Sequence, residues 1–180
     1  MEVVPEFTQK DLVSIARQRG LVYFLNGLSI AGLKSERDQA GKPSYWYNYL
    51  KGKPAENQLG LVGQVAIFPE DPMLQGAYYR MLPEQLKLVK GHAKDLDLVC
   101  AQAIVGTIST LTGALFAHAD VRGEYLLSNV WARSTTIVES PYVADVGDSS
   151  PREGFCVGHW GRGGRSGDLG VLRLIVPVRK

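Results

Sequence analysis

The C-terminal stretch GFCVGHWGRGGRSGDLGVLRLIVPV (residues 154–178) places two apolar runs on either side of a glycine-rich loop. The runs 155–160 and 169–178 contain valine, isoleucine and aromatic residues, which are common in strands. The loop between them, GRGGRSG, holds four glycines, which can adopt the positive φ angles that sharp turns require. The stretch therefore predicts a final antiparallel pair of strands connected by residues 161–167.

Two helices are predicted outside this pair. Thr8 can cap a short amphipathic helix near the N-terminus, and Asp11, three residues later, can complete the capping box. Pro83 is typical of a first helical turn and predicts a central helix that ends near Gly91. With the strands, these elements predict an α+β fold: a mainly antiparallel sheet with an N-terminal helix and one or two central helices. The composition changes nowhere along the chain, so we expect a single globular domain over residues 1–180.

Strands are also predicted earlier in the chain. Asn26-Gly27 lies between two apolar runs and is typical of a tight turn, so residues 21–25 and 28–33 are expected to pair as a hairpin. Apolar, aromatic and β-branched residues bounded by glycine or proline predict further strands in three segments: residues 59–68, 76–82 and 124–139.

Residues 98–117 run for twenty positions without a charge, which is the length of a membrane-spanning helix. Their hydropathy is modest, however, because they include one glutamine, one serine, three threonines and two glycines. This composition favours a buried helix, or a strand–turn–strand around residues 110–113, over a membrane segment.

Charge and cysteine content exclude some classes of protein. The 20 Lys+Arg and 18 Asp+Glu residues give a net charge of +2, which does not by itself indicate a nucleic-acid partner. The only cysteines, Cys100 and Cys156, disfavour a disulfide framework and indicate a reducing compartment. The N-terminal residues MEVVPEFTQKD contain no apolar core of signal-peptide length. We therefore expect a soluble, cytoplasmic protein that does not bind membranes.

A basic, tyrosine-rich stretch, KPSYWYNYLKGK, is the first candidate binding surface. In an extended strand, Trp46 and Leu50 would face the core, and the three tyrosines would share the opposite face beside the lysines. Such a face suits a protein partner or the stacked bases of single-stranded nucleic acid, and the alternative is that it packs inside the fold. The candidate binding residues are Tyr45, Tyr47, Tyr49, Lys51 and Lys53.

The glycine-rich loop is the second candidate. It lacks the lysine and the following helix of a Walker motif, and Ser166 stands where a dinucleotide motif has its third glycine. Arg162 and Arg165, together with backbone N–H groups, could still hold a phosphate or a carboxylate. The alternative is a flexible, solvated loop that only joins two strands.

Catalytic and metal sites have less support. Cys156 and His159 lie three positions apart in a predicted strand, so they should face opposite sides and not form a dyad. In HADVRGEY, His118 could act as a base that Asp120 orients. Residues 144–154, ADVGDSSPREG, are expected to be a polar loop with three carboxylates. The cysteines and histidines lack zinc-site spacing, so neither a metal nor a cofactor is expected.

These features predict a non-catalytic binding or assembly protein. It would use the tyrosine-rich basic face and the arginine-bearing glycine loop against a protein partner or a second copy of itself, with nucleic acid such as RNA as an alternative partner. The competing interpretation is a small hydrolase or transferase that acts on an anionic substrate, with His118 or Cys156 as the reactive group. Binding is preferred because the sequence specifies no base next to a candidate nucleophile.

Overall fold

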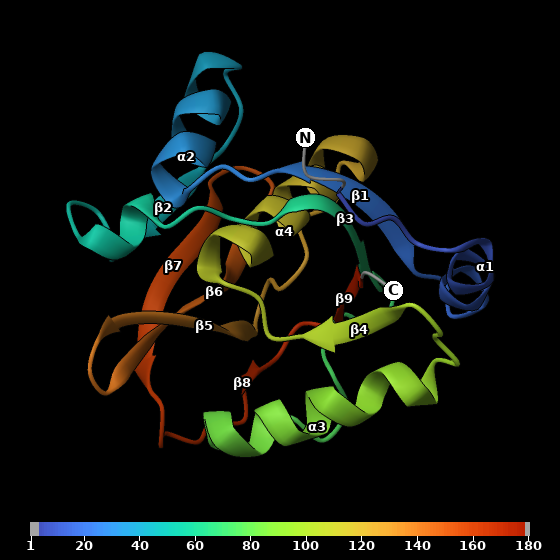
Figure 1. Cartoon of the computed structure of the whole chain (residues 1–180). Helices are drawn as coiled ribbons and strands as arrows, with labels where there is room; N and C mark the ends of the chain where they lie inside the picture. Colours follow the sequence, from blue (N-terminus) through green and yellow to red (C-terminus); the bar gives the residue numbers. More distant parts are fainter. Residues whose placement is uncertain (1–3, 179–180) are drawn as a thin grey trace.

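The computed structural model describes residues 4–178 and has an α+β architecture (Figure 1). These residues contain four α-helices: α1 (Gln9–Arg17), α2 (Ile30–Gln39), α3 (Leu82–Asp95) and α4 (Ile108–Arg122). The predicted fold class and the N-terminal helix are thus confirmed. In the described part of the chain, however, three α-helices follow the first one, not one or two.

Residues 4–178 form two sheets, where a single mainly antiparallel sheet was predicted. The antiparallel sheet has, in spatial order, β1 (Leu21–Asn26), β3 (Val62–Ile67), β9 (Leu174–Pro177) and β4 (Ala101–Ile104). The mixed sheet has, in spatial order, β2 (Tyr45–Asn48), β7 (Gly154–Gly161), β6 (Tyr142–Ser150), β5 (Trp131–Glu139) and β8 (Leu169–Gly170). Its two edge strands are the parallel ones: β2 runs parallel to β7, and β8 runs parallel to β5.

Helix α1 begins as the sequence predicts. The hydroxyl oxygen of Thr8 accepts a hydrogen bond from the backbone N–H of Asp11 at 3.2 Å, and the Asp11 carboxylate accepts one from the backbone N–H of Thr8 at 3.3 Å. These two bonds are the capping box. The other oxygen of Asp11 accepts from the backbone N–H groups of Val99 and Cys100 at 2.7 and 3.3 Å, which fastens α1 to the segment before β4.

The predicted hairpin at Asn26-Gly27 is wrong. Strand β1 ends at Asn26, and Gly27 has a positive φ of 76°, but β1 pairs with β3. Ser29 then caps α2, because its hydroxyl accepts a hydrogen bond from the backbone N–H of Gly32 at 3.2 Å. The predicted second strand is therefore the first part of a helix, because Ser29 satisfies an N–H group that a helix start leaves free.

The region around Pro83 also departs from the prediction in part. Residues 76–82 form turns and the start of a helix, not a strand. Pro83 does lie in the first turn of α3, but the helix continues past Gly91 to Asp95. A glycine inside a helix costs only about 1 kcal/mol relative to alanine, so it need not end the helix.

The uncharged segment 98–117 divides between strand β4 and helix α4. Thr107 caps α4 by accepting a hydrogen bond from the backbone N–H of Thr110 at 3.2 Å. The helix is buried over most of its length because it packs against β1 of the antiparallel sheet and against β5 and β6 of the mixed sheet. The buried-helix prediction is therefore confirmed from Ile108 onward. Across residues 4–178, every helix is too short or too polar to cross a membrane.

The predicted terminal pair of strands is wrong because its two members belong to different sheets. Strand β7 lies between β2 and β6, whereas β9 lies between β3 and β4. The glycine-rich loop and β8 therefore carry the chain from the mixed sheet to the antiparallel sheet. Alternating apolar residues identify a strand but do not reveal which strand it pairs with.

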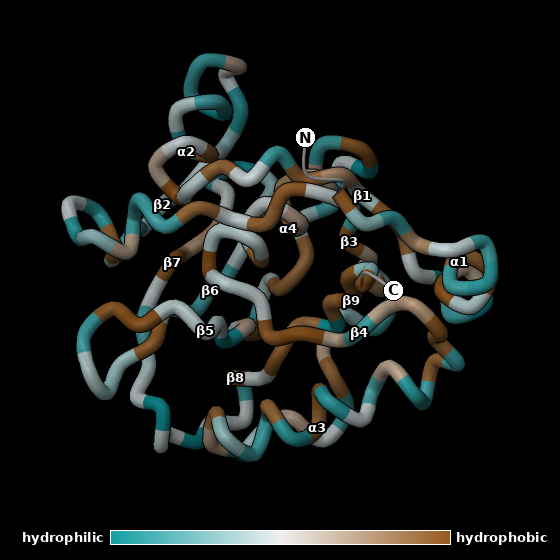
Figure 2. The backbone as a smooth tube through the Cα atoms, in the orientation of Figure 1, coloured by the Kyte–Doolittle hydropathy of each residue, from teal (hydrophilic) through white to brown (hydrophobic). Residues whose placement is uncertain are grey.

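Both sheets share a hydrophobic core around α4. Leu115 on α4, Val157 on β7 and Leu174 on β9 belong to one cluster of buried side chains. Figure 2 shows hydrophobic residues along β4 and β9, whereas hydrophilic residues gather on α1 and on the far end of α2, at the periphery. The inner face of the mixed sheet is thus occupied by this core, and on its outer face Val143 of β6 packs with Leu82 of α3 in a second buried cluster.

Candidate functional site

The three tyrosines predicted to form one face lie in three different environments. Strand β2 has an irregularity between Tyr45 and Tyr47, so these two residues lie opposite Phe155 and Cys156, which are consecutive on β7. Tyr45 therefore points into the core, and burial raises the pKa of its phenol well above the usual value. Tyr47 points outward and is 48% exposed. The prediction of a shared tyrosine face is wrong because it assumed an unbroken strand.

Tyr49 lies beyond the end of β2 and belongs to a separate aromatic stack. Its ring stacks on the ring of His159 with 3.7 Å between centroids, and the ammonium group of Lys53 lies 4.6 Å from its centroid. Leu50 is buried as predicted, whereas Trp46, which was also expected in the core, is 48% exposed. Tyr49 and Lys53 therefore contact each other, while Lys51 is exposed.

The glycine-rich loop is held against α3 and does not project freely. The carbonyl oxygen of Arg162 accepts a hydrogen bond from the backbone N–H of Leu82 at 3.0 Å, and a guanidinium nitrogen of Arg165 lies 3.2 Å from Oε1 of Glu84. The Arg133 guanidinium donates to the carbonyl oxygen of Gly164 at 3.0 Å. Arg165 thus already has an anionic partner, which weakens the interpretation of this loop as an anion cradle.

The outer face of the mixed sheet contains a cavity of about 250 Å³ that we call the Asp145 pocket. In the register of β6 and β7, Asp145 lies opposite Gly158, and Gly147 lies opposite Cys156, so these residues share one face of the sheet. Residues from β2, β5, β6, β7 and the segment around β8 line the cavity: Tyr47, Trp131, Asp145, Cys156, Gly158, His159, Trp160, Asp168 and Leu169.

Asp145 is the most unusual residue of this pocket. The polar loop predicted over residues 144–154 is in fact largely strand β6, and Asp145 lies near its middle with 2% of its surface exposed. Its Oδ1 atom has no hydrogen-bond partner among the described residues. Desolvation by burial raises the pKa of this carboxyl to about 7, and Asp168 adds to the rise. The charge of Arg133 on β5 and the backbone N–H of Gly158 oppose it. A buried polar atom without a partner is rare in folded proteins. Among the described residues, Tyr45, His118 and Arg133 also have one such atom, but of these four residues only Asp145 lines this pocket.

Two glycines of the C-terminal stretch shape the pocket. A Cβ atom at Gly158 would lie 2.6 Å from Oδ1 of Asp145 and 3.2 Å from the ring of Trp131. A Cβ atom at Gly164 would lie only 2.1 Å from Nε1 of Trp160. Glycine is therefore needed at both positions, at Gly158 to admit the carboxylate and at Gly164 to seat the Trp160 indole against the loop.

The thiol of Cys156 lines the same pocket but is not activated. Burial raises its pKa to about 12, and the nearby carboxylates of Asp145 and Asp148 add to this effect. The thiol is therefore protonated near neutral pH, whereas a nucleophilic cysteine needs a lowered pKa. The register places Cys156 opposite Gly147 and His159 opposite Ala144, which agrees with the prediction that the two side chains face opposite sides.

His118 is buried among partners that differ from the predicted one. Its Nδ1 lies 2.8 Å from the hydroxyl of Tyr23, and its Nε2 lies 3.5 Å from Oε2 of Glu124. Asp120 does not orient it, because residues two apart on a helix lie on different faces. The His118 side chain is 1% exposed, and desolvation lowers its pKa. It also lines a separate cavity of about 480 Å³ together with Arg122 and Glu124, so it lies apart from the Asp145 pocket.

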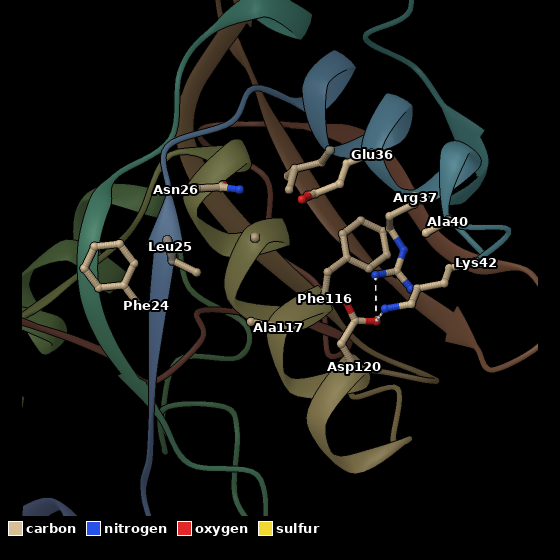
Figure 3. A pocket seen from close by; sticks show the side chains of 12 residues that line it. Phe24, Leu25, Asn26, Glu36, Arg37, Ala40, Lys42, Phe116, Ala117 and Asp120 are labelled. Carbon is tan, nitrogen blue, oxygen red and sulfur yellow. Dashed lines mark hydrogen bonds and ion pairs between the residues drawn. The ribbon is translucent and has the colours of Figure 1, made fainter.

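A second cavity of about 280 Å³, which we call the Arg37 groove, lies between β1, α2 and α4 (Figure 3). The guanidinium of Arg37 stacks over the ring of Phe116 at 3.9 Å and donates to Oδ1 of Asp120 at 3.1 Å. It also donates to the hydroxyl of Tyr125 at 2.9 Å, and Nζ of Lys42 lies 3.1 Å from the same oxygen of Asp120. The charges of this groove thus neutralise one another within the protein.

Of the predicted binding residues, only Tyr47 lines the Asp145 pocket. Cys156, predicted as a possible reactive group, also lines the pocket. Asp145 was predicted only as one of the carboxylates of a polar loop, and Trp131 and Trp160 were not predicted. Among the described residues there is no group of three or more His, Cys, Asp or Glu side chains that could hold a metal ion. Comparison with known proteins gives no further guidance, because no family model, no curated protein and no solved structure matches the chain.

Proposed function

We propose that this chain is a non-catalytic binding protein and that the Asp145 pocket is its recognition site. The observation that supports the proposal best is the position of Asp145. This residue lines a cavity, yet only 2% of its surface is exposed. Its Oδ1 is buried without a hydrogen-bond partner among the described residues, so a ligand that brings a positive charge into the cavity would stabilise the carboxylate.

The rim of the pocket supports binding to a partner larger than the cavity. Tyr47 and Trp160 line the pocket and are 48% and 44% exposed, and Trp46 lies next to Tyr47 in the chain with 48% exposed. Aromatic side chains are enriched in the centres of protein interfaces because they bury a large area at low entropic cost. In this proposal a small group enters the cavity, and a larger partner also contacts the exposed rings.

Binding is preferred over catalysis because the two expected reactive groups are poorly placed for chemistry. The pKa of the Cys156 thiol is raised to about 12, which leaves almost no thiolate near neutral pH. His118 is buried against Tyr23 and Glu124 and lies outside the Asp145 pocket. Nucleic acid is also a poorer partner for this pocket, because its lining residues include two aspartates and neither lysine nor arginine.

The three tryptophans of the chain allow a direct test by NMR. A set of small cations, anions and neutral aromatic compounds is added to ¹⁵N-labelled protein, and the three indole N–H signals are followed. We expect some compounds to shift the signals of Trp131 and Trp160, which line the pocket, but not the signal of Trp46, which does not. A set in which no compound shifts the two pocket signals would contradict the proposed site.

Tyr47 and Trp46 offer a matched pair of variants, because they are neighbours with the same exposed fraction of 48%. Tyr47→Ala should raise the Kd of a pocket-binding compound about threefold to tenfold, since one aromatic wall contributes roughly 1 kcal/mol. Trp46→Ala should leave the Kd unchanged. Equal losses in both variants would mean that the compounds bind the exposed aromatic surface and not the cavity.

A further inference from the structure

We infer that the group bound in the Asp145 pocket is an alkylated ammonium cation, an inference that rests on the proposed function and specifies its ligand. Three properties of the pocket lead to this class of ligand: the sign of its charge, the chemistry of its walls and the commitment of its nearest cationic side chain elsewhere. Each is a property of the described residues.

The charge of the lining is negative. The pocket includes the carboxylates of Asp145 and Asp168 but no lysine or arginine side chain. Asp145 is almost fully buried and Asp168 is exposed, so one carboxylate lies at the floor and the other near the mouth. An anionic ligand would meet two like charges here, whereas a cation would form the close ion pair that the buried carboxylate does not form with Arg133.

The nearest buried cation, Arg133, is engaged elsewhere. It lies opposite Asp145 in the register of β5 and β6, but its guanidinium nitrogens donate to the carbonyl oxygens of Arg80 and Gly164 and to Oε1 of Gln85. The three donor–acceptor distances are 3.3, 3.0 and 3.1 Å. Arg133 therefore anchors the loop and α3, while its buried Nε has no hydrogen-bond partner among the described residues. Its charge lowers the pKa of Asp145, but it forms no ion pair within 4.0 Å of that carboxylate.

The walls are aromatic, which selects the kind of cation. Tyr47, Trp131 and Trp160 line the cavity, and tryptophan gives the strongest attraction for a cation placed over a ring face. A methylated ammonium group is weakly hydrated and apolar on its outside, so it loses little on leaving water and gains from contact with the rings. A carboxylate together with aromatic walls is the arrangement that recognises choline-like and methyl-lysine groups. A bare inorganic cation would gain little from walls of this kind.

The size of the cavity agrees with such a group. A volume of about 250 Å³ lies just below the range of roughly 300–1,000 Å³ that drug-sized ligands occupy. The cavity therefore suits the head of a ligand and not a whole drug-sized molecule. The exposed rings of Tyr47 and Trp160 at the rim would contact whatever carries the head group.

The test compares choline with 3,3-dimethylbutan-1-ol, which has nearly the same shape but a carbon atom in place of the charged nitrogen. Both are titrated into ¹⁵N-labelled wild-type protein, with the indole signals of Trp131 and Trp160 as the readout. We expect choline to bind with a Kd at least tenfold lower than the neutral alcohol. Equal affinities would overturn the cation inference but not the proposal that the pocket binds a ligand. That proposal is tested separately by the set of small compounds, through the indole signals of Trp131 and Trp160.

Asp145→Asn gives an independent check, because asparagine keeps the shape of the side chain but cannot ionise. The variant should bind choline and the neutral alcohol with similar affinity, and a thermal melt confirms that it is folded. A tenfold preference for choline that persists in the folded variant would contradict the role of Asp145 in the inference.

The source of the ammonium group is distinguished by a second ligand. A short peptide that carries one trimethyllysine is compared with the same peptide carrying unmodified lysine. Tighter binding of the trimethylated peptide than of choline would indicate a partner protein, whereas choline binding without peptide binding would indicate a small molecule. Both results support the cation class, and a failure of choline and of the trimethylated peptide to shift either indole signal would overturn it.

Discussion

The Arg37 groove and the Asp145 pocket both contain a charged side chain that is almost fully buried, yet the two charges have different surroundings. Arg37 is 4% exposed and contacts Asp120, the Tyr125 hydroxyl and the face of Phe116. Asp145 is 2% exposed, and its Oδ1 has no hydrogen-bond partner among the described residues. The Arg37 groove and the Asp145 pocket have similar volumes, but the charged side chains of the groove already neutralise one another.

This difference separates a structural charge from a functional one. Burying an ion is unfavourable unless partners replace the water it loses, so a fully paired charge mainly holds its neighbours in place. An unpaired buried charge makes the folded state less stable, and such destabilised groups cluster at binding and catalytic sites. The comparison therefore predicts opposite results when each charge is removed. The protein should become less stable when the Arg37 charge is removed and more stable when the Asp145 charge is removed.

The largest expected effect is a stabilisation by Asp145→Asn. In the folded protein the pKa of Asp145 is raised from 3.8 to about 7, so the unfolded chain binds fewer protons than the folded chain between these values. The wild-type free energy of unfolding therefore falls as the pH rises from 4 to 7. At pH 8 the variant should be more stable by up to about 4 kcal/mol, because one pKa unit corresponds to about 1.4 kcal/mol.

Chemical denaturation at pH 4 and pH 8 measures this effect. At pH 4 the two proteins should differ by less than about 1 kcal/mol, because the folded wild-type carboxyl is then protonated. Glu153→Gln removes an exposed carboxylate that follows β6 and serves as the control, with no comparable gain at pH 8. An Asp145→Asn variant less stable than wild type at pH 8 would show that the carboxylate has a stabilising partner after all.

The second effect is a loss of stability by Arg37→Ala. The substitution removes the hydrogen bonds to Asp120 and Tyr125 and the contact with Phe116, so the free energy of unfolding should fall by about 3 kcal/mol. Arg165→Ala is the matched control, because its ion pair with Glu84 is exposed and should contribute less than about 1 kcal/mol. Equal small losses in both variants would make the groove a candidate binding site like the pocket.

The sequence predicts the α+β class, the capping box of α1 and the buried helix α4, because caps and apolar runs depend on residues close together in the chain. It does not predict that β7 and β9 belong to different sheets, since strand pairing depends on residues far apart. Asp145 was assigned to a loop because glycine, serine and aspartate are typical of turns. Strand β6 is covered on both faces, so it lacks the alternation that marks a strand with one exposed face.

The candidate site was predicted less well than the fold. Tyr47 was chosen correctly as an outward-facing aromatic residue, but the irregularity in β2 separates it from Tyr45 and no composition rule signals such a bulge. The glycines of the C-terminal stretch were interpreted as a flexible turn. Two of them instead stand where a Cβ atom would meet a pocket residue, and only the folded structure reveals this contact.

The smallest of the three effects tests that contact with two neighbouring glycines. A Cβ atom at Gly164 would lie 2.1 Å from Nε1 of Trp160, whereas a Cβ atom at Gly163 would meet nothing within 4 Å. Gly164→Ala must displace the indole and should lower the free energy of unfolding by about 1 kcal/mol, a typical cost of overpacking. It should also shift the Trp160 indole signal and weaken ligand binding in the Asp145 pocket.

Gly163→Ala changes the backbone freedom of the same loop without touching the indole, so it separates the two causes. It should leave the Trp160 signal and the ligand Kd unchanged, with a stability within about 0.5 kcal/mol of wild type. If both variants weaken binding alike, the loop acts through its flexibility, as the sequence alone suggested. If only Gly164→Ala weakens binding, Gly164 is required to position the Trp160 indole, and the loop supports one wall of the pocket.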